Sequence, residues 1–214
     1  MSYELKMPAE WEEHTATLMH WPSNHETWPG ERLERVENVY LDILKSLSRF
    51  EKILLLAETI QVQERIEILF SKKEINKENI SIKVYPVNDV WARDCGPIFV
   101  KRDNEFVITD WEYNAWGEKY PPWDSDNRVP KFLADQYGMD RISTNIVLEG
   151  GSIDVNGVGD LLTTESVLLN LNRNPDLTKE EIEQKLEKYL GAKNIIWLKS
   201  GLAGDDTDGH IDDL

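Results

Sequence analysis

Apolar side chains recur every three or four residues along three stretches of the chain, the spacing of a helix that buries one face. The longest of these stretches covers residues 31–50. The second follows a cap at Thr59, and the third begins with the capping box of Thr178 and stops at Gly191. A shorter helix, with a proline at its start, is predicted over residues 130–137.

Short apolar runs, rich in β-branched residues and bounded by turn-forming residues, alternate with these helices. They predict strands over residues 16–21, 52–57, 80–87, 98–101, 106–111, 146–148, 160–164 and 194–199. Polar turns at residues 102–104 and 156–157 predict two tight connections between strands. Because strand pairs alternate with single helices, we expect one α/β domain of similar modules over residues 1–214.

Composition narrows the classes of partner. The 214 residues include 24 basic and 40 acidic side chains, which gives a formal net charge of -16 and a pI near 4.7. This charge disfavours nucleic acid and anionic membranes and suits a cationic ligand, although acidity also serves solubility alone. The N-terminus shows no signal-peptide pattern, and no apolar run is long enough to span a bilayer, so we expect a cytoplasmic protein.

Residues 87–97 form the most site-like stretch, because Trp91, Arg93 and Asp94 lie there between two apolar runs. Such groups are costly to bury unpaired, so a fold retains them when they pair with each other or with a ligand. The Gly-Pro pair that follows predicts that Asp94 lies at a strand end. A purely structural Arg93–Asp94 ion pair is the alternative.

Three acids predicted at strand ends, Asp94, Glu149 and Asp212, can converge on one pocket with His210. His210 and Asp212 point to the same face if their segment is a strand. Carboxylates with one histidine suit a divalent metal, and they equally suit the planar N–H donors of a guanidinium packed against Trp91 or another ring. A histidine near a reacting centre can act as general acid and base. The third interpretation, beside a metal site and a guanidinium site, is that these side chains belong to a core without a catalytic role.

An aperiodic segment over residues 113–124 holds four aromatic side chains, more than an ordinary solvated loop. This composition has two interpretations: the segment covers a binding site, or its rings fill the rim of the apolar core.

Six sequence segments stand out along the chain: NDVWARDCGP (88–97), NAWGEKYPP (114–122), EGGSI (149–153), LTTE (162–165), NLNRNP (170–175) and DGHID (208–212). In sequence and in order they closely resemble the agmatine deiminase family, which is related to the bacterial peptidylarginine deiminases. The resemblance runs over nearly the whole chain.

This resemblance implies the pentein fold, an α/β propeller of five pseudo-repeated strand-and-helix modules around a central site. It also implies hydrolysis of agmatine to N-carbamoylputrescine and ammonia, a step in putrescine and polyamine biosynthesis. In the family a cysteine thiolate attacks the guanidinium carbon and a thiouronium adduct is then hydrolysed, without metal or cofactor.

The family's site residues carry over motif by motif. Asp94 and Asp212 are expected to hold the guanidinium, and His210 is expected to be the general acid and base. Glu149 and Trp91 are expected to line the pocket, with Glu149 bonding the substrate or orienting His210.

Trp116, in the aromatic segment, is expected to contribute to substrate binding. The family's nucleophilic cysteine, which lies in a Gly-rich segment near the C-terminus, has no counterpart among residues 1–214, where Cys95 is the only thiol and no internal disulfide can form. If Asp94 faces the substrate from a strand, Cys95 faces away and is a small buried residue.

We therefore expect an incomplete propeller that lacks its C-terminal modules and binds agmatine without turning it over. Its exposed apolar edges would favour a homo-oligomer or association with a missing C-terminal segment. The alternatives are a peptidylarginine or arginine deiminase, and a non-catalytic cation-binding remnant.

Overall fold

The structure, a computed structural model, describes residues 4–103 and 105–214. Its contacts divide the chain into two compact units, Glu13–Ala92 and the combination of Met1–Glu12 with Arg93–Leu214. Each unit has its own sheets and its own apolar core. The organisation of residues 1–214 as one domain stays a prediction, and Asn104 of the predicted turn lies outside the described residues.

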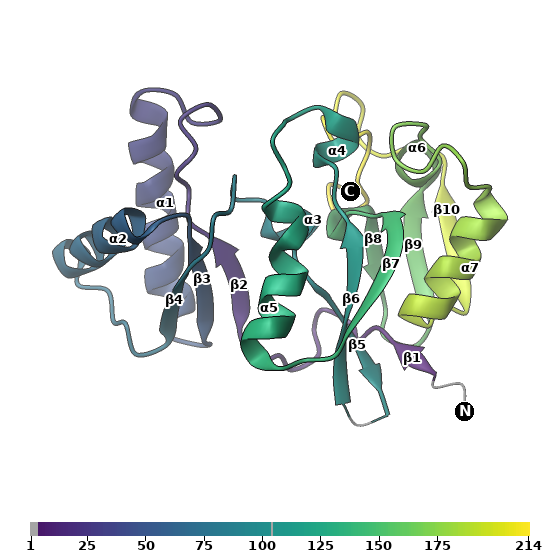
Figure 1. Cartoon of the computed structure of the whole chain (residues 1–214), viewed down its shortest axis with the longest axis horizontal. Coiled ribbons are helices and arrows are strands. Elements are labelled where there is room, and N and C mark those ends of the chain that lie inside the picture. The colour runs from purple at the N-terminus through teal and green to yellow at the C-terminus, as the bar shows by residue number, and fades with distance from the viewer. Residues whose placement is uncertain (1–3, 104) are drawn as a thin grey trace. The chain divides into compact units, whose positions relative to one another are not determined.

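The Glu13–Ala92 unit is a three-stranded parallel sheet with two crossover helices (Figure 1). Its elements are β2 (Thr17–His20), α1 (Glu31–Leu47), β3 (Ile53–Ala57), α2 (Ile60–Lys73) and β4 (Ile80–Val84). Leu44 of α1 and Phe70 of α2 pack on Leu55 of β3 in the core. The predicted elements are confirmed, with two shortened ends. Helix α1 stops before Phe50, which is 82% exposed, and β4 stops before residue 87.

The Arg93–Leu214 part contains two modules of identical topology, each a hairpin, a helix and a strand parallel to the hairpin's second strand. The first module is β5 (Ile98–Arg102), β6 (Glu105–Glu112), α5 (Val129–Tyr137) and β7 (Arg141–Val147). The second is β8 (Ile153–Val155), β9 (Asp160–Thr164), α7 (Lys179–Leu190) and β10 (Asn194–Leu198). Strand β1 (Leu5–Lys6) pairs antiparallel with β5.

Short helical turns lie in the connections: α3 (Ala92–Cys95), α4 (Ala115–Glu118), η1 (Asp126–Arg128), η2 (Gly150–Ser152) and α6 (Glu165–Leu168). The predicted capping box is present at α7, where Thr178 and Glu181 bond each other's backbone N–H groups, and Gly191 ends the helix with φ 71°. Local signals therefore place this helix to the residue.

The two modules share one core, in which Ile182 and Leu186 of α7 pack with residues of both sheets such as Val107 and Leu161. The described residues form three sheets, none of which closes on itself, so the five-module propeller stays a prediction. Among the same residues, no helix combines the length and apolar composition needed to cross a membrane.

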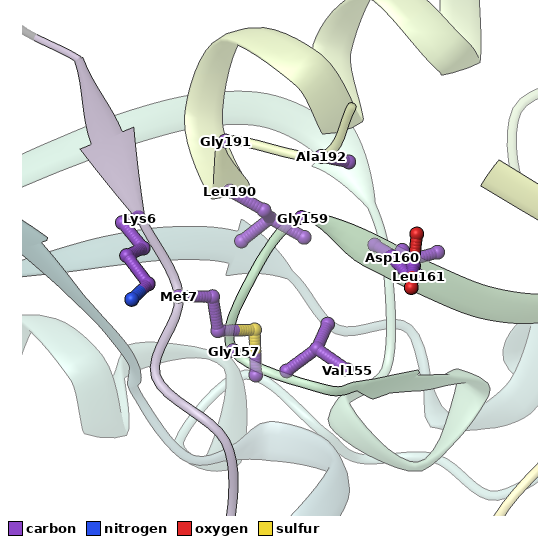
Figure 2. A pocket seen from close by; sticks show the side chains of 10 residues that line it. All are labelled: Lys6, Met7, Val155, Gly157, Gly159, Asp160, Leu161, Leu190, Gly191 and Ala192. Carbon is purple, nitrogen blue, oxygen red and sulfur yellow. The ribbon is translucent and has the colours of Figure 1, made fainter. Parts of the chain in front are cut away.

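A cavity of about 10 Å³ lies among β1, the β8–β9 connection and the end of α7 (Figure 2). Met7, Val155 and Leu190 contribute apolar walls to it. This volume holds about one water molecule. It is lined by none of the acids that the sequence nominates, so it is a small packing space rather than the candidate site.

Candidate active site

Asp94 lies in the short helix α3 just before β5, and not at a strand end as predicted. Its carboxylate is 8% exposed and accepts two hydrogen bonds, from Gly151 N to Oδ1 at 3.0 Å and from Trp116 Nε1 to Oδ2 at 3.1 Å. These donors come from residues far along the chain, so the local Gly-Pro signal contained no information about them. The carboxylate is held rigidly, although its backbone is not extended.

His210 and Asp212 reach the same place from the segment after β10, yellow in Figure 1. His210 Nδ1 lies 3.5 Å from Asp94 Oδ1 and 3.8 Å from Asp212 Oδ1. The strand considered for the segment of His210 and Asp212 does not form, because Asp208 and Gly209 have φ values of 72° and 105°. Asp205 holds this loop, since its Oδ2 accepts the backbone N–H of His210 at 3.1 Å.

Gly151 lies at the centre of this group. A Cβ atom at this position would lie 2.6 Å from Asp94 Oδ1, 2.6 Å from His210 Nδ1 and 2.7 Å from Asp212 Oδ2. Its carbonyl oxygen also accepts the backbone N–H of Asp212 at 3.3 Å. Only glycine lets the two carboxylates and the imidazole approach one another this closely.

Glu149, directly before the Gly-Gly bend, is fully buried. Its Oε1 accepts a hydrogen bond from Arg173 Nε at 2.5 Å, and both side chains are 0% exposed. Its Oε2 has no hydrogen-bond partner among the described residues, and the same holds for His210 Nε2. Two buried polar atoms are therefore left ready for a ligand that can donate to one and exchange a proton with the other.

The site is strongly anionic, and its buried groups are perturbed accordingly. The pKa of Asp94 is raised to about 7, because burial disfavours its charge and because Glu149 and Asp212 are negative neighbours. Burial likewise raises the pKa of Asp212 and of Glu149, although Arg173 opposes the rise at Glu149. Burial lowers the pKa of His210 to about 4, and the charge of Arg173 acts in the same direction. At neutral pH His210 is a neutral base.

Trp116 is presented by an unusual turn. Ala115, Trp116, Gly117 and Glu118 all have positive φ, from 50° to 89°, which makes one left-handed turn. For non-glycine residues this conformation costs roughly 1–2 kcal/mol each. Asn114 stabilises the turn by accepting the N–H of Gly117 at 2.9 Å. The aromatic segment thus supplies a donor to Asp94 through Trp116, and the rings of Tyr113 and Trp116 pack with Cys95.

The remaining nominated residues lie as follows. Arg93 forms ion pairs with Glu10 and with Asp212, at 3.8 Å for the latter, so the described contacts do not include the alternative Arg93–Asp94 pair. Cys95 is 3% exposed and packs with Tyr113 and Trp116. Trp91 belongs to the Glu13–Ala92 unit and is 40% exposed, and its pocket role stays a prediction.

Sequence reasoning gave no role to Arg173, Asp205 or Asp208. Arg173 stands in the NLNRNP segment, where a charged residue flanked by asparagines was the available signal. The pattern Asp205-Asp206-Thr207 is a signal for a side-chain-capped turn, because Thr207 N and Oγ1 both donate to the Asp205 carboxylate.

Asp94, His210 and Asp212 each offer one ligand atom within 4.8 Å of the others, and in the described part of the chain they are the group that could hold a metal ion. The same oxygens suit the N–H groups of a guanidinium. The arrangement therefore defines a class, an α/β protein with a buried acidic site that contains a neutral histidine.

The chain belongs to the Porphyromonas-type peptidyl-arginine deiminase family, whose model matches residues 6–214. It is 39% identical over 215 residues to the agmatine deiminase of Pseudomonas aeruginosa (strain LESB58), covering 98% of this chain and 56% of the relative. The chain spans about three fifths of the length of the curated relatives it matches. The resemblance to agmatine deiminases is confirmed.

Solved structures agree. The agmatine deiminase of Enterococcus faecalis superposes with a TM-score of 0.88 at 36% identity, over 99% of this chain and 57% of that one. A cysteine-to-serine form of the C. jejuni agmatine deiminase, with substrate bound, gives a TM-score of 0.83 at 34% identity, over 97% of this chain and 60% of that one. The fold is therefore the mixed α/β fold of agmatine deiminases.

Proposed function

We propose that the protein hydrolyses agmatine to N-carbamoylputrescine and ammonia, and that residues 1–214 supply the guanidinium site and the proton-transfer histidine. The observation that carries this proposal is the buried cluster of Asp94, Glu149 and His210, in which Glu149 Oε2 and His210 Nε2 have no partner among the described residues. A guanidinium has planar N–H donors and a positive charge, which match those carboxylate oxygens.

In this proposal each residue has a separate task. Asp94 and Asp212 flank the His210 ring and hold two nitrogens of the guanidinium, which keeps it positive and its carbon electrophilic. Trp116 fixes Asp94 by its indole N–H, and Trp91 is a candidate wall of the pocket. Glu149 binds a further nitrogen or orients His210.

The bonds change in two stages. The cysteine thiol gives its proton to neutral His210 as its sulfur adds to the guanidinium carbon. His210 passes that proton to one nitrogen, which leaves as ammonia, and a thiouronium results. His210 then removes a proton from water as the water oxygen adds to the same carbon. The C–S bond breaks while the new hydroxyl gives its proton to the sulfur, which releases the ureido product and the thiol, and the proton on His210 passes to ammonia. A neutral imidazole at neutral pH suits both proton transfers.

The attacking thiol is proposed not to be among residues 1–214. Cys95 is buried among aromatic rings, and burial in apolar surroundings disfavours the reactive thiolate. The cysteine-to-serine form used for the substrate-bound C. jejuni structure agrees with cysteine chemistry in the family. A segment of residues 1–214 alone is expected to bind agmatine and release no ammonia. Ammonia release that is lost on Cys95→Ala would overturn this part.

The activity is tested with the full-length gene product and agmatine, by measuring ammonia and N-carbamoylputrescine. His210→Gln is expected to lower kcat by about 10²–10⁴-fold while agmatine still binds. His25→Gln, an exposed histidine of the other unit, is the matched control and should keep wild-type kcat. Equal effects of the two substitutions would refute the role of His210.

Competition assays separate the substrate classes. Agmatine lacks the α-carboxylate of arginine and the flanking amides of an arginyl peptide. We expect agmatine turnover that excess arginine does not inhibit. Preferred turnover of free arginine or of an arginyl peptide would refute agmatine as the substrate, and binding without turnover by the full-length gene product would indicate a non-catalytic cation-binding protein.

A further inference from the structure

Arg173 has no role so far, although it contacts Glu149 and the loop that precedes His210. Its side chain is 0% exposed, and all three nitrogens donate hydrogen bonds. Nε donates to Glu149 Oε1 at 2.5 Å, Nη1 donates to Asp208 Oδ2 at 2.8 Å, and Nη2 donates to the carbonyl of Thr207 at 3.1 Å. One guanidinium thus joins the acid after β7 to the loop before His210.

The turn that carries Arg173 is itself anchored to β7. Asn174 accepts the backbone N–H of Val147 at 2.9 Å and donates to its carbonyl oxygen at 2.8 Å, two residues before Glu149. Arg173 therefore approaches Glu149 from a support that is fixed to the same strand. The position of its guanidinium is set by the backbone of β7 and not by a flexible loop.

The other end of the network reaches the aromatic segment. Asp208 also accepts hydrogen bonds from Asn172 Nδ2 at 3.1 Å and from Lys119 Nζ at 2.8 Å. Burial alone would raise the pKa of Asp208, but its bonds to Lys119, Arg173 and Asn172 lower it, so its charge faces Arg173 throughout the neutral range. Two carboxylates, Glu149 and Asp208, bracket one buried cation.

We propose that Arg173 is the positioning residue of the site: it leaves Glu149 Oε2 as the oxygen available to a bound guanidinium, and it locks the His210 loop to the end of β7. This role rests on the proposed function. It explains why Oε1 of Glu149 is occupied while Oε2 has no partner among the described residues. It also explains the NLNRNP segment, because Asn172 bonds Asp208, Arg173 bonds Glu149 and Asp208, and Asn174 bonds the backbone of β7.

A lysine cannot replace this arginine in the proposed role. The guanidinium uses three nitrogens in one plane toward four acceptors, the fourth being Asn172 Oδ1, which accepts from Nη1 at 2.7 Å, whereas an ammonium is a single point charge. Arg173→Lys keeps the charge and loses the fixed geometry. In the full-length gene product we expect kcat for agmatine to fall about 100-fold, the usual cost of displacing a reacting group by about 1 Å. KM should rise less than kcat falls, because Asp94 and Asp212, which still hold the guanidinium, are not bonded to Arg173.

Arg141→Lys is the matched control. Arg141 stands at the start of β7 and pairs with Asp110, at the opposite end of the strand from Glu149. It should keep wild-type kcat and KM. In a Glu149→Gln background, Arg173→Lys should cost far less than in the wild type, because the contact it disturbs is already altered.

The outcomes separate the two proposals. If the wild type turns over agmatine and folded Arg173→Lys has the same kcat, only the positioning role is overturned. The same conclusion follows if the effects of Glu149→Gln and Arg173→Lys on kcat add fully in the double variant. If Arg173→Lys fails to fold, Asp208→Asn replaces it, because this partly exposed residue breaks the same network, and unchanged kcat there again overturns the role. No agmatine turnover by the wild type overturns the proposed function, and the role of Arg173 in that reaction with it.

Discussion

Burial of the Asp94 carboxylate costs the fold stability. This carboxylate is buried with two negative neighbours, and two N–H donors only partly compensate. Because its pKa rises from 3.8 to about 7 on folding, the folded state holds a proton that the unfolded chain releases. The stability from this proton is fully present below pH 3.8 and is lost as the pH rises through about 7.

Asp94→Asn is therefore expected to raise the free energy of unfolding relative to wild type at about pH 8, by roughly 1–3 kcal/mol after the loss of one acceptor is included. The difference should shrink as the pH falls toward 4, and urea unfolding at several pH values measures it. Asp208→Asn is the control of opposite sign, because the pKa of Asp208 is lowered and its charge stabilises the fold at neutral pH. A pH-independent difference for Asp94→Asn would contradict the argument.

The same substitution tests binding. A bound guanidinium favours ionised Asp94, so agmatine binding should release a proton near pH 7 and weaken as the pH falls. Calorimetry in two buffers of different ionisation enthalpy measures that proton. Asp94→Asn should abolish both the binding and the proton release, and wild-type affinity in this variant would contradict the assignment of Asp94.

At the scale of elements, the left-handed turn α4 stands out, because Gly117 at φ 89° lies directly against Asn172. A Cβ at residue 117 would lie 2.3 Å from Asn172 Nδ2, so Gly117→Ala must displace the side chain that bonds Asp208. We expect this variant to lose about 1–2 kcal/mol of stability through backbone strain and also to lose agmatine affinity.

Gly138→Ala separates these two effects. Gly138 ends α5 with φ 62°, and nothing lies within 4 Å of a Cβ built there. It should therefore show the strain cost in thermal unfolding and keep the wild-type affinity for agmatine. If both variants bind agmatine equally well, the contact between α4 and Asn172 has no part in the site.

Helices whose ends are marked by nearby capping residues were predictable from the sequence. Contacts between residues far apart in the sequence were not. The cap of α2 at Thr59 and the capping box of α7 involve bonds that span three residues, which a sequence displays directly. The contacts of Arg173 with Glu149 and Asp208 span 24 and 35 residues. The NLNRNP segment could be noticed as a motif, but only the fold brings its arginine to those acids.

The same reasoning explains two places where the backbone differs from the expected strand. The Gly-Pro pair predicted Asp94 at a strand end, and a strand was considered for the segment of His210 and Asp212, but the structure has a helical turn and a loop there. In both places a bond from a distant or capping group decides the backbone, Gly151 N to Asp94 and Asp205 to the N–H of His210. The functional role of the four side chains of the candidate site stays a prediction, although the structure brings side-chain atoms of Asp94, His210 and Asp212 within 4.8 Å of one another.

At the scale of the Arg93–Leu214 unit, the site is made from the connections that precede and follow its two modules. Asp94 precedes the first hairpin, Glu149 lies between β7 and β8, and His210 follows β10. Repetition of one hairpin–helix–strand module therefore delivers three connections to one place, and each supplies a different group. The modules provide the scaffold, and the connections hold the side chains of the candidate site.

The negative charge of residues 1–214 affects how a cation reaches the candidate site. A formal net charge of -16 attracts a cation from a distance, and salt screens this attraction, whereas contacts in a buried site are screened much less. We expect the Kd for agmatine to rise several-fold between about 50 and 500 mM NaCl. Replacing exposed acids of α7, as in Glu180→Gln with Glu187→Gln, should flatten this dependence and leave the Kd at high salt unchanged. Asp94→Asn should weaken binding at every salt concentration. If the Kd for agmatine does not depend on salt, the local contacts of the buried carboxylates account for the affinity, and long-range electrostatic attraction contributes nothing to it.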